Sequence, residues 1–351
     1  MSDFHPQVVR IEKIEKHPNA DTLSIYTVLG IYPVVDKTDK FQVNDLVSYI
    51  CVDAIVPNTE QFHFLASPPK KDKDGNVISL PSTVVELSIR NRTIRAKKIR
   101  GIYSEGLIMP APPGFQEGDS IIEYFNLTKR VYEEELPEQT SSSHESPPTT
   151  FSLFKYDLEG VAKYKYVFQD DEPVIITEKI EGENCAIMYA EDRLWVRSRN
   201  YFKKNEPDSH WWDLPRRLNL EEKLKQFPNL AIWFELYGAV KGWSYDCPIV
   251  NGRIERKGRV FDIWDIKQRK FLEWKDVQNI TQQIGMETVP VLYEGPWKSD
   301  HSLNILAEGQ STIGKCVKEG WVMRSTPEGW HEKLGRKIIK LKGRDYKIAK
   351  G

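Results

Sequence analysis

A strongly polar segment divides the chain into two parts. Residues 131–150 read VYEEELPEQTSSSHESPPTT, where Glu, Ser, Thr and Pro dominate and almost no side chain could pack in a core. Such a composition predicts a linker or a disordered loop between separately folded domains. About 130 residues precede it and about 200 follow it, and both lengths are ordinary for one domain. We therefore expect domains at 1–130 and 151–351, joined by a linker at 131–150.

The composition fits two globular domains and limits the classes of function. Hydrophobic residues make up 40% of the 351 positions, enough to fill two cores. The net charge is -1, so a nucleic-acid surface would have to be a local patch. The four cysteines are far apart, with no CxxC pair and no clustered histidines, which predicts free thiols rather than a zinc site. Without a secretion signal or a membrane-spanning run, we expect a soluble cytoplasmic or nuclear protein.

Short β-branched runs dominate the N-terminal part of the sequence. They lie at residues 8–11, 23–28, 46–50 and 84–87, and turn residues separate them. This pattern predicts a small all-β barrel.

The C-terminal part mixes strand patterns with a few helical stretches. Helices are predicted at 219–226 and at 274–284, where Trp274, Val277 and Ile280 are spaced for one apolar face. An α+β domain with antiparallel sheets fits this pattern. Neither GxGxxG nor GxxxxGKS follows a predicted strand, which argues against Rossmann and P-loop nucleotide sites.

A cluster of charges interrupts two apolar runs in this C-terminal part. Residues 177–187, TEKIEGENCAI, directly follow the apolar residues 174–176. Ionised groups are costly to bury unless they are partnered or used, so Lys179 among Glu178, Glu181 and Glu183 indicates a site. A lysine attacks phosphorus only as the free amine, which burial or neighbouring cations favour.

Further charged residues stand where apolar strands end. Lys340 and Lys342 alternate along residues 338–342 and therefore share one face of a predicted strand, where they could bind one phosphate. Glu235 and Glu319 lie at similar transitions, and Mg²⁺ is usually held by a few carboxylates, waters and phosphate oxygens. Each residue alone would be an ordinary surface charge. Together they outline a site for a nucleoside triphosphate and a metal ion.

The order of these short motifs resembles the covalent nucleotidyltransferase superfamily of ligases and mRNA capping enzymes. KIEGEN at 179–184 resembles motif I, KxxGxN. Resemblances to motifs Ia, III, IIIa, IV and V follow in order at 197–199, 235–238, 261–263, 319–322 and 340–342. DNA ligases and capping enzymes usually carry arginine where this chain has Asn184, and asparagine is typical of RNA ligases.

The N-terminal part adds a second resemblance. Residues 14–23 and 99–107 resemble the OB-fold tRNA-binding domain of some tRNA synthetases. An OB domain ahead of a nucleotidyltransferase domain is similar to the fifth family of ATP-dependent RNA ligases, which commonly has Asp at the position of Glu181. The chain ends nine residues after Lys342, leaving no room for the C-terminal OB domain of DNA ligases and capping enzymes.

The resemblance implies an activity and its reactants. The enzyme would join RNA 3′-OH and 5′-phosphate ends through AMP carried on Lys179. The expected substrate is a duplex-containing RNA, in nick sealing or RNA repair. ATP supplies the AMP, and Mg²⁺ or Mn²⁺ assists. Neither a membrane nor a protein partner is implied.

The resemblance also implies a role for each candidate residue. Lys340 and Lys342 would neutralise the α-phosphate, and Glu181, Glu235 and Glu319 would hold a hydrated metal ion. The nucleotide would contact a further set: Glu178 at the adenine amino group, Phe261 stacked on adenine, Arg197 and Arg199 at the ribose or incoming 5′-phosphate, Asn184 near nucleotide and metal, and Gly182 allowing close backbone approach.

Two basic runs, 91–100 and 335–350, suggest where a polynucleotide binds. Two alternatives remain open: an mRNA guanylyltransferase, and a non-catalytic RNA-binding protein with a degenerate ligase domain. The motifs leave Trp211 and Trp212 unexplained, with core packing as the default. They also leave open the physiological RNA, the oligomeric state and the pathway.

Overall fold

The computed structural model describes residues 4–65, 70–71, 77–79, 92–130, 143–151, 153–238, 243 and 245–350. The chain forms two compact units. The first comprises Met1–Glu133 together with Lys347–Gly351, and the second comprises Glu134–Tyr346. The strand predicted at 84–87 and residues 131–142 of the predicted linker lie outside the described residues.

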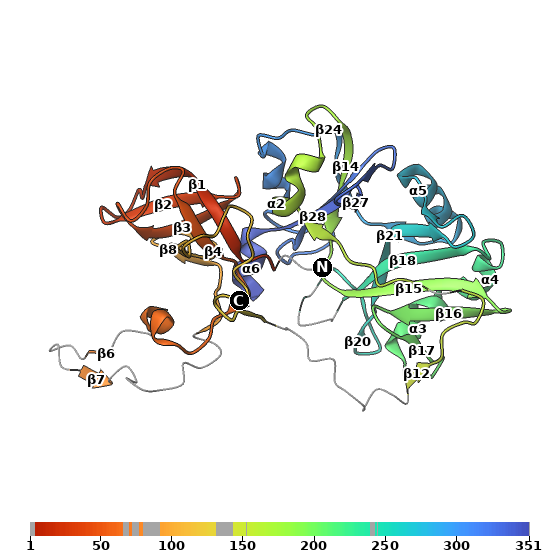
Figure 1. Cartoon of the computed structure of the whole chain (residues 1–351). Coiled ribbons are helices and arrows are strands. Elements are labelled where there is room, and N and C mark those ends of the chain that lie inside the picture. Colours follow the sequence, from red (N-terminus) through yellow and green to blue (C-terminus); the bar gives the residue numbers. More distant parts are fainter. Residues whose placement is uncertain are drawn as a thin grey trace. The chain divides into compact units, whose positions relative to one another are not determined.

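The N-terminal unit is built on a five-stranded antiparallel sheet (Figure 1). Its order is β10 (Leu107–Pro110), β4 (Leu46–Ile50), β1 (Gln7–Lys16), β2 (Leu23–Val28) and β3 (Tyr32–Lys37). Burial alternates along β2, as expected when one face of a strand covers a core. The strands predicted at 8–11, 23–28 and 46–50 are confirmed.

Smaller elements complete this unit. They are β5 (Ala54–Ile55), paired with β11 (Thr128–Lys129); the 3₁₀ helix η1 (Glu60–Leu65); and the hairpins β6 (Lys70–Lys71) with β7 (Val77–Ser79) and β8 (Lys97–Ile99) with β9 (Ile102–Ser104). Phe62 of η1 is fully buried with Val8, Ile50 and Ile121 in one core cluster.

Two sheets form the C-terminal unit. The eight-stranded sheet contains β12 (His144–Glu145), β17 (Phe202–Lys203), β16 (Arg193–Ser198), β15 (Glu183–Ala190), β18 (Leu230–Tyr237), β21 (Lys257–Asp265), β22 (Lys270–Phe271) and β23 (Glu287–Thr288). The second contains β13 (Glu159–Gly160), β28 (Ile338–Lys342), β25 (Gly320–Ser325), β14 (Pro173–Lys179) and β24 (Val291–Pro296). We call it the lysine sheet because it carries Lys179, Lys340 and Lys342. All strand pairs in the two sheets are antiparallel except β13 with β28 and β21 with β23.

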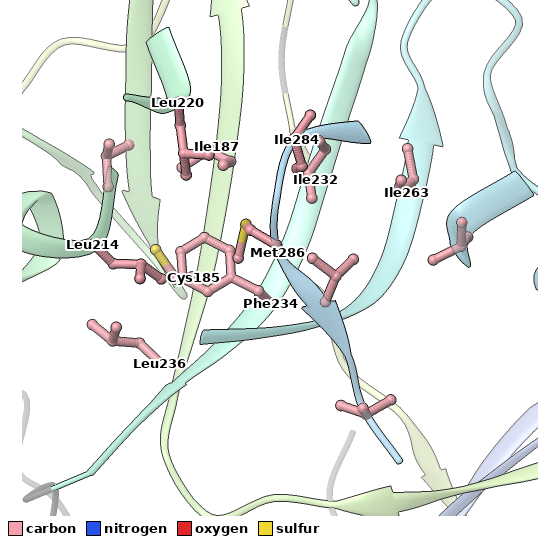
Figure 2. Packing of buried hydrophobic residues seen from close by; sticks show 14 of the residues in the cluster. Cys185, Ile187, Leu214, Leu220, Ile232, Phe234, Leu236, Ile263, Ile284 and Met286 are labelled. Carbon is pink, nitrogen blue, oxygen red and sulfur yellow. The ribbon is translucent and has the colours of Figure 1, made fainter. Parts of the chain in front are cut away.

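Helices cover one face of the eight-stranded sheet. They are α3 (His210–Arg217), α4 (Leu220–Leu224) and α5 (Trp274–Gln283). Figure 2 shows part of the resulting core, in which Cys185 and Phe234 pack with Leu214, Leu220 and Met286. The helices predicted at 219–226 and 274–284 are confirmed, although α4 is shorter than expected. The opposite face carries Met188, Trp195 and Trp233 in a second cluster.

Short elements complete the C-terminal unit. These are α2 (Val161–Tyr164), η3 (Lys165–Val167), η5 (Ser302–Ala307), and the hairpins β19 (Ile249–Val250) with β20 (Arg253–Ile254) and β26 (Trp330–His331) with β27 (Gly335–Arg336). The last helix, α6, spans Arg344–Lys350.

The second half of the predicted linker belongs to this unit. Strand β12 pairs with β17, and the His144 ring stacks on Tyr201 at a centroid separation of 4.4 Å. The backbone N–H groups of Thr149 and Thr150 donate to the Glu191 carboxylate at 2.7 and 3.1 Å. Residues 143–150 therefore contact this unit, because polar side chains there find partners that their composition does not reveal.

Two other expectations can be compared with the structure. No disulfide joins any of the four cysteines, all of which the structure describes, and Cys51 and Cys185 are buried. No helix in the described ranges is long and apolar enough to cross a membrane.

Candidate active site

Strand register brings the three predicted lysines together on the lysine sheet. Lys179, the last residue of β14, lies opposite Gly320 on β25, and Gly320 lies opposite Lys342 on β28. Lys340 lies two residues before Lys342, so the two project from the same face of β28. Residues that are more than 160 positions apart in the sequence thus form one row.

Gly320 allows β28 to approach β25 closely at this row of residues. A Cβ at this position would lie 1.9 Å from the carbonyl oxygen of Leu341, and the backbone φ is +152°. Both the close approach of β28 and the backbone conformation therefore require glycine.

A buried carboxylate links two of the lysines. The Lys179 ammonium donates to Glu319 Oε2 at 2.8 Å, and Lys342 Nζ lies 3.8 Å from Glu319 Oε1. Only 3% of Glu319 is exposed. Burial alone would lower the pKa of Lys179, but the charges of Glu319, Glu235 and Glu181 outweigh it and raise that pKa. The prediction that neighbouring cations lower the pKa of Lys179 is thus wrong for the protein without ligands, because the nearest charges are those of carboxylates.

Two tyrosines hold the turn after Lys179. The backbone N–H of Glu181 donates to Tyr245 Oη at 2.8 Å, and Tyr346 Oη donates to the Glu181 carboxylate at 2.5 Å. The sequence reasoning missed both residues. Tyr346 stands only four residues after Lys342, but nothing in its local pattern indicates that its hydroxyl faces Glu181.

The predicted metal-binding carboxylates surround Lys179 without forming a compact cluster. Glu181, Glu235 and Glu319 all contribute to its electrostatic environment. Across the described ranges, no group of three or more His, Cys, Asp or Glu side chains is close enough to hold a metal ion directly.

The other half of the site lies on the eight-stranded sheet. Asn184 of β15 is opposite Glu235 of β18, and Arg197 of β16 is opposite Ala186 of β15. Because Ala186 lies two residues after Asn184, these side chains share one face. Arg197 is 7% exposed and donates to the Phe154 carbonyl at 3.0 Å. Burial lowers the pKa of its guanidinium.

Asp157 brings together two predicted phosphate-binding cations. Arg199 donates to one oxygen of Asp157 at 3.0 Å, and Lys340 Nζ lies 3.8 Å from the other. Burial raises the pKa of Asp157, but Lys340 and Arg199 outweigh burial and lower it. The sequence reasoning did not include Asp157.

Phe261 occupies a β-bulge of β21. Trp233 is opposite Asp262 and Phe234 is opposite Val260, so Phe261 is left out of the ladder. Its partly buried ring makes an edge contact with Tyr156 at a centroid distance of 5.0 Å.

Glu178 is placed differently from the prediction. It is 1% exposed, and its carboxylate accepts hydrogen bonds from the Thr312 backbone N–H at 2.9 Å, the Thr312 hydroxyl at 2.6 Å and the Ser311 hydroxyl. The carboxylate therefore fixes the loop at 311–312, and its expected hydrogen bond to adenine is not supported.

Gly182 is required by packing. A Cβ there would lie 2.5 Å from the Leu236 carbonyl oxygen and 2.9 Å from Glu235 Cγ. The glycine thus lets the turn after Lys179 approach β18.

The motifs leave Trp211 and Trp212 unexplained, and the structure places both at a core. Trp212 is 2% exposed and donates to the Lys203 carbonyl at 2.8 Å, and Trp211 packs beside the core cluster that contains Trp212.

Comparison with known proteins shows what each part of the chain resembles. Residues 172–342 match the RNA ligase family model, and residues 6–111 match an OB-fold domain model. No match was found among curated proteins.

Several solved structures share the fold over nearly the whole chain. A mutant Naegleria gruberi RNA ligase with ATP and Mn is 20% identical, with a TM-score of 0.73 and 98% of each chain covered. The same ligase with PPi is 19% identical, with a TM-score of 0.71, 99% of this chain and 98% of the other being covered. The predicted OB barrel and α+β domain are confirmed. Residues 172–342 thus resemble an RNA ligase domain, and they follow an N-terminal part that resembles an OB-fold domain.

Proposed function

We propose that this protein joins RNA ends through AMP carried on Lys179. One observation carries the proposal: strand register places Lys179 and Lys342 on either side of Gly320, and buried Glu319 contacts both lysines. A nucleophilic amine beside phosphate-neutralising cations is what phosphoryl transfer to a lysine requires. We assign RNA binding to residues 1–130 and nucleotide chemistry to residues 151–351.

Three displacements at phosphorus make up the reaction. The Lys179 amine forms a P–N bond to the α-phosphorus of ATP, and pyrophosphate leaves. An RNA 5′-phosphate oxygen then displaces Lys179 and takes the AMP. A 3′-OH finally attacks the activated 5′-phosphate, expels AMP and leaves a phosphodiester bond. Lys340 and Lys342 neutralise the phosphoryl oxygens during these steps.

A divalent metal ion fits the carboxylates around Lys179. Solved Naegleria gruberi ligase mutants contain ATP or AMP together with Mn. In the present chain, Glu181, Glu235 and Glu319 would hold hydrated Mg²⁺ or Mn²⁺. When bound, the ion supplies positive charge that favours the neutral Lys179 amine and stabilises charge on the phosphates.

The nucleotide occupies the face that Arg197, Asn184 and Phe261 share in our proposal. Phe261 stacks on adenine, while Arg197, which has no carboxylate partner within ion-pair distance among the described residues, binds the ribose or a phosphate. Arg199 binds the incoming 5′-phosphate in exchange for Asp157. A nicked or otherwise duplex-containing RNA, in RNA repair or nick sealing, is the substrate class we favour.

Intact-protein mass spectrometry tests the proposal. Wild type and Lys179→Ala are incubated with ATP or GTP and Mg²⁺, after bound AMP has been removed. We expect an AMP adduct on the wild type alone, with ATP and not with GTP. A GMP adduct would favour a guanylyltransferase. No adduct with either nucleotide, together with RNA binding that Lys179→Ala leaves intact, would favour the RNA-binding alternative.

A further inference from the structure

A buried ion cluster lies behind Phe261. Asp262 is fully buried and accepts a hydrogen bond from Tyr156 Oη at 2.6 Å. Arg324 Nη1 donates to it at 3.3 Å, and Arg336 donates to both of its oxygens. Arg336 also forms an ion pair with Glu328 at 2.6 Å.

This cluster connects the two sheets that carry the proposed site. Asp262 belongs to β21 of the eight-stranded sheet, and Arg324 belongs to β25 of the lysine sheet. Arg336 ends β27, two residues before β28 begins. The ion pairs therefore join the strand that carries Phe261 to β25, the strand that carries Gly320, and to β27, which precedes β28 in the chain.

Two members of the cluster also touch Phe261 directly. Arg324 Nη2 donates to the Phe261 carbonyl at 2.7 Å, and this carbonyl belongs to the bulged residue outside the ladder. The Tyr156 ring meets the Phe261 ring edge to face, and the Tyr156 hydroxyl is fixed by Asp262. Both the backbone and the ring of Phe261 are thus held by groups that Asp262 orients.

Stability alone does not explain such a cluster. Burying charges costs free energy that their attraction often only offsets, and apolar residues of similar volume are frequently as stable. A rigid set of hydrogen bonds does provide a single geometry, which a stacking ring next to a bound base requires.

We propose that Asp262, Arg324 and Tyr156 are positioning residues that aim Phe261 at the adenine ring. This inference rests on the proposed function, because it assigns a determinant of ATP binding at the same site. Arg336 donates to Asp262 but does not contact Phe261. Substituting Arg336 therefore tests the stability of the cluster without removing a contact to Phe261.

The test compares Arg324→Lys with Arg336→Lys. Each variant keeps a positive charge in the cluster and removes one guanidinium from Asp262, so both should lower the melting temperature. Only Arg324→Lys loses the contact with Phe261. Its KM for ATP in lysine adenylylation should rise about tenfold, as expected from weakened stacking, while kcat changes less. Phe261→Leu should raise KM at least as much, and Arg336→Lys should leave KM near the wild-type value.

A spectroscopic measurement reports stacking without catalysis. The fluorescence of 2-aminopurine riboside triphosphate is quenched when its base stacks on an aromatic ring. We expect quenching by wild type and Arg336→Lys, and less quenching by Arg324→Lys and Phe261→Leu. Equal KM and quenching for the two arginine variants would overturn the inference.

A milder substitution covers the case in which Arg324→Lys does not fold. Tyr156→Phe removes only the hydroxyl that contacts Asp262 and keeps the ring beside Phe261. It should reduce quenching and raise KM, and unchanged values would count against the inference. Failure of this inference can be distinguished from failure of the proposed function. If the proposed function is wrong, the wild type itself forms no AMP adduct.

Discussion

At the scale of single residues, the site depends on hydrogen bonds to buried carboxylates. Glu178, Glu181, Glu319 and Asp262 are each no more than 5% exposed, and each accepts hydrogen bonds from named partners. A buried carboxylate that loses its donors retains the cost of desolvation. Substitutions that remove one donor or one carboxylate are therefore the most informative at this scale.

Asp262→Asn should destabilise the protein in a pH-dependent way. Arg336 and Arg324 outweigh burial and lower the pKa of Asp262. Its contribution to stability is thus fully present above the ordinary aspartate pKa of about 3.9 and is lost as the pH falls through the lower pKa of the folded state. Breaking a buried ion pair costs about 3–5 kcal/mol, so we expect a loss of this size at neutral pH.

Urea unfolding of wild type and Asp262→Asn near neutral pH and in acid measures this effect. The free-energy difference between them should shrink in acid, since protonation removes the same charge from the wild type. A difference that stays constant over the acid range would contradict the assignment of the lowered pKa to Asp262.

Tyr346→Phe should lower the affinity for Mg²⁺ rather than the maximal rate of adenylylation. The substitution removes the hydroxyl that donates to the Glu181 carboxylate. Loss of a group that orients a metal-binding carboxylate typically costs about tenfold or more in metal affinity. The Mg²⁺ concentration that gives half-maximal adenylylation should rise by about this factor. Tyr293→Phe, which removes a hydroxyl donating to the Pro296 carbonyl, is the control. An unchanged Mg²⁺ requirement would show that Tyr346 is only structural.

At the scale of elements, strand pairing determines the distance between Lys179 and Lys342, the two lysines that we propose to be catalytic. Strand β25 lies between β14 and β28, and its first residue separates Lys179 from Lys342. The spacing therefore depends on the absence of a side chain at Gly320.

Gly320→Ala should move β28 away and impair both stability and adenylylation. Its Cβ would overlap the Leu341 carbonyl oxygen. Overpacking and backbone strain together should cost about 3 kcal/mol. Gly309→Ala is the matched control, because Gly309 also has a positive φ of +85° but nothing within 4 Å of its Cβ. It should cost only about 1 kcal/mol and leave adenylylation unchanged. Equal losses in the two variants, by thermal unfolding and adduct formation, would exclude the steric explanation.

At the scale of the whole molecule, we propose that the two compact units have different functions. The residues proposed to handle ATP all lie in Glu134–Tyr346, whereas the first basic run, 91–100, lies in the N-terminal unit. Of that run, Lys97 and Lys98 are exposed on β8. An OB-fold surface with clustered cations commonly follows a nucleic-acid backbone.

Reversing the charges of Lys97 and Lys98 to Glu should weaken RNA binding without affecting the AMP adduct. If each lysine neutralises one phosphate, the slope of log affinity against log salt should decrease by about two. Fluorescence anisotropy with a nicked RNA duplex at several salt concentrations measures this. Lys13→Glu, at an exposed position of β1, is the control for a surface charge. Unchanged affinity at low salt would contradict an RNA role for this run.

Much of the fold and part of the site could be predicted because their signals are local. Short β-branched runs between turn residues identified β2 and β4, and the spacing of Trp274 and Val277 identified α5. Alternation along residues 338–342 placed Lys340 and Lys342 on one face. Each of these signals depends on residues within one element, so no partner from elsewhere in the chain was needed.

The sequence alone thus determined the two-domain organisation, the main strands and helices, and the ordered motifs that mark Lys179 and its accompanying charges. Only the tertiary structure decided which charges meet. It directed Glu178 to Thr312, Glu181 to Tyr346, and Asp262 to Arg324 and Arg336. The first two pairs are separated by 134 and 165 positions. Partners this distant leave no periodic signal, because the register and packing of the two sheets select them.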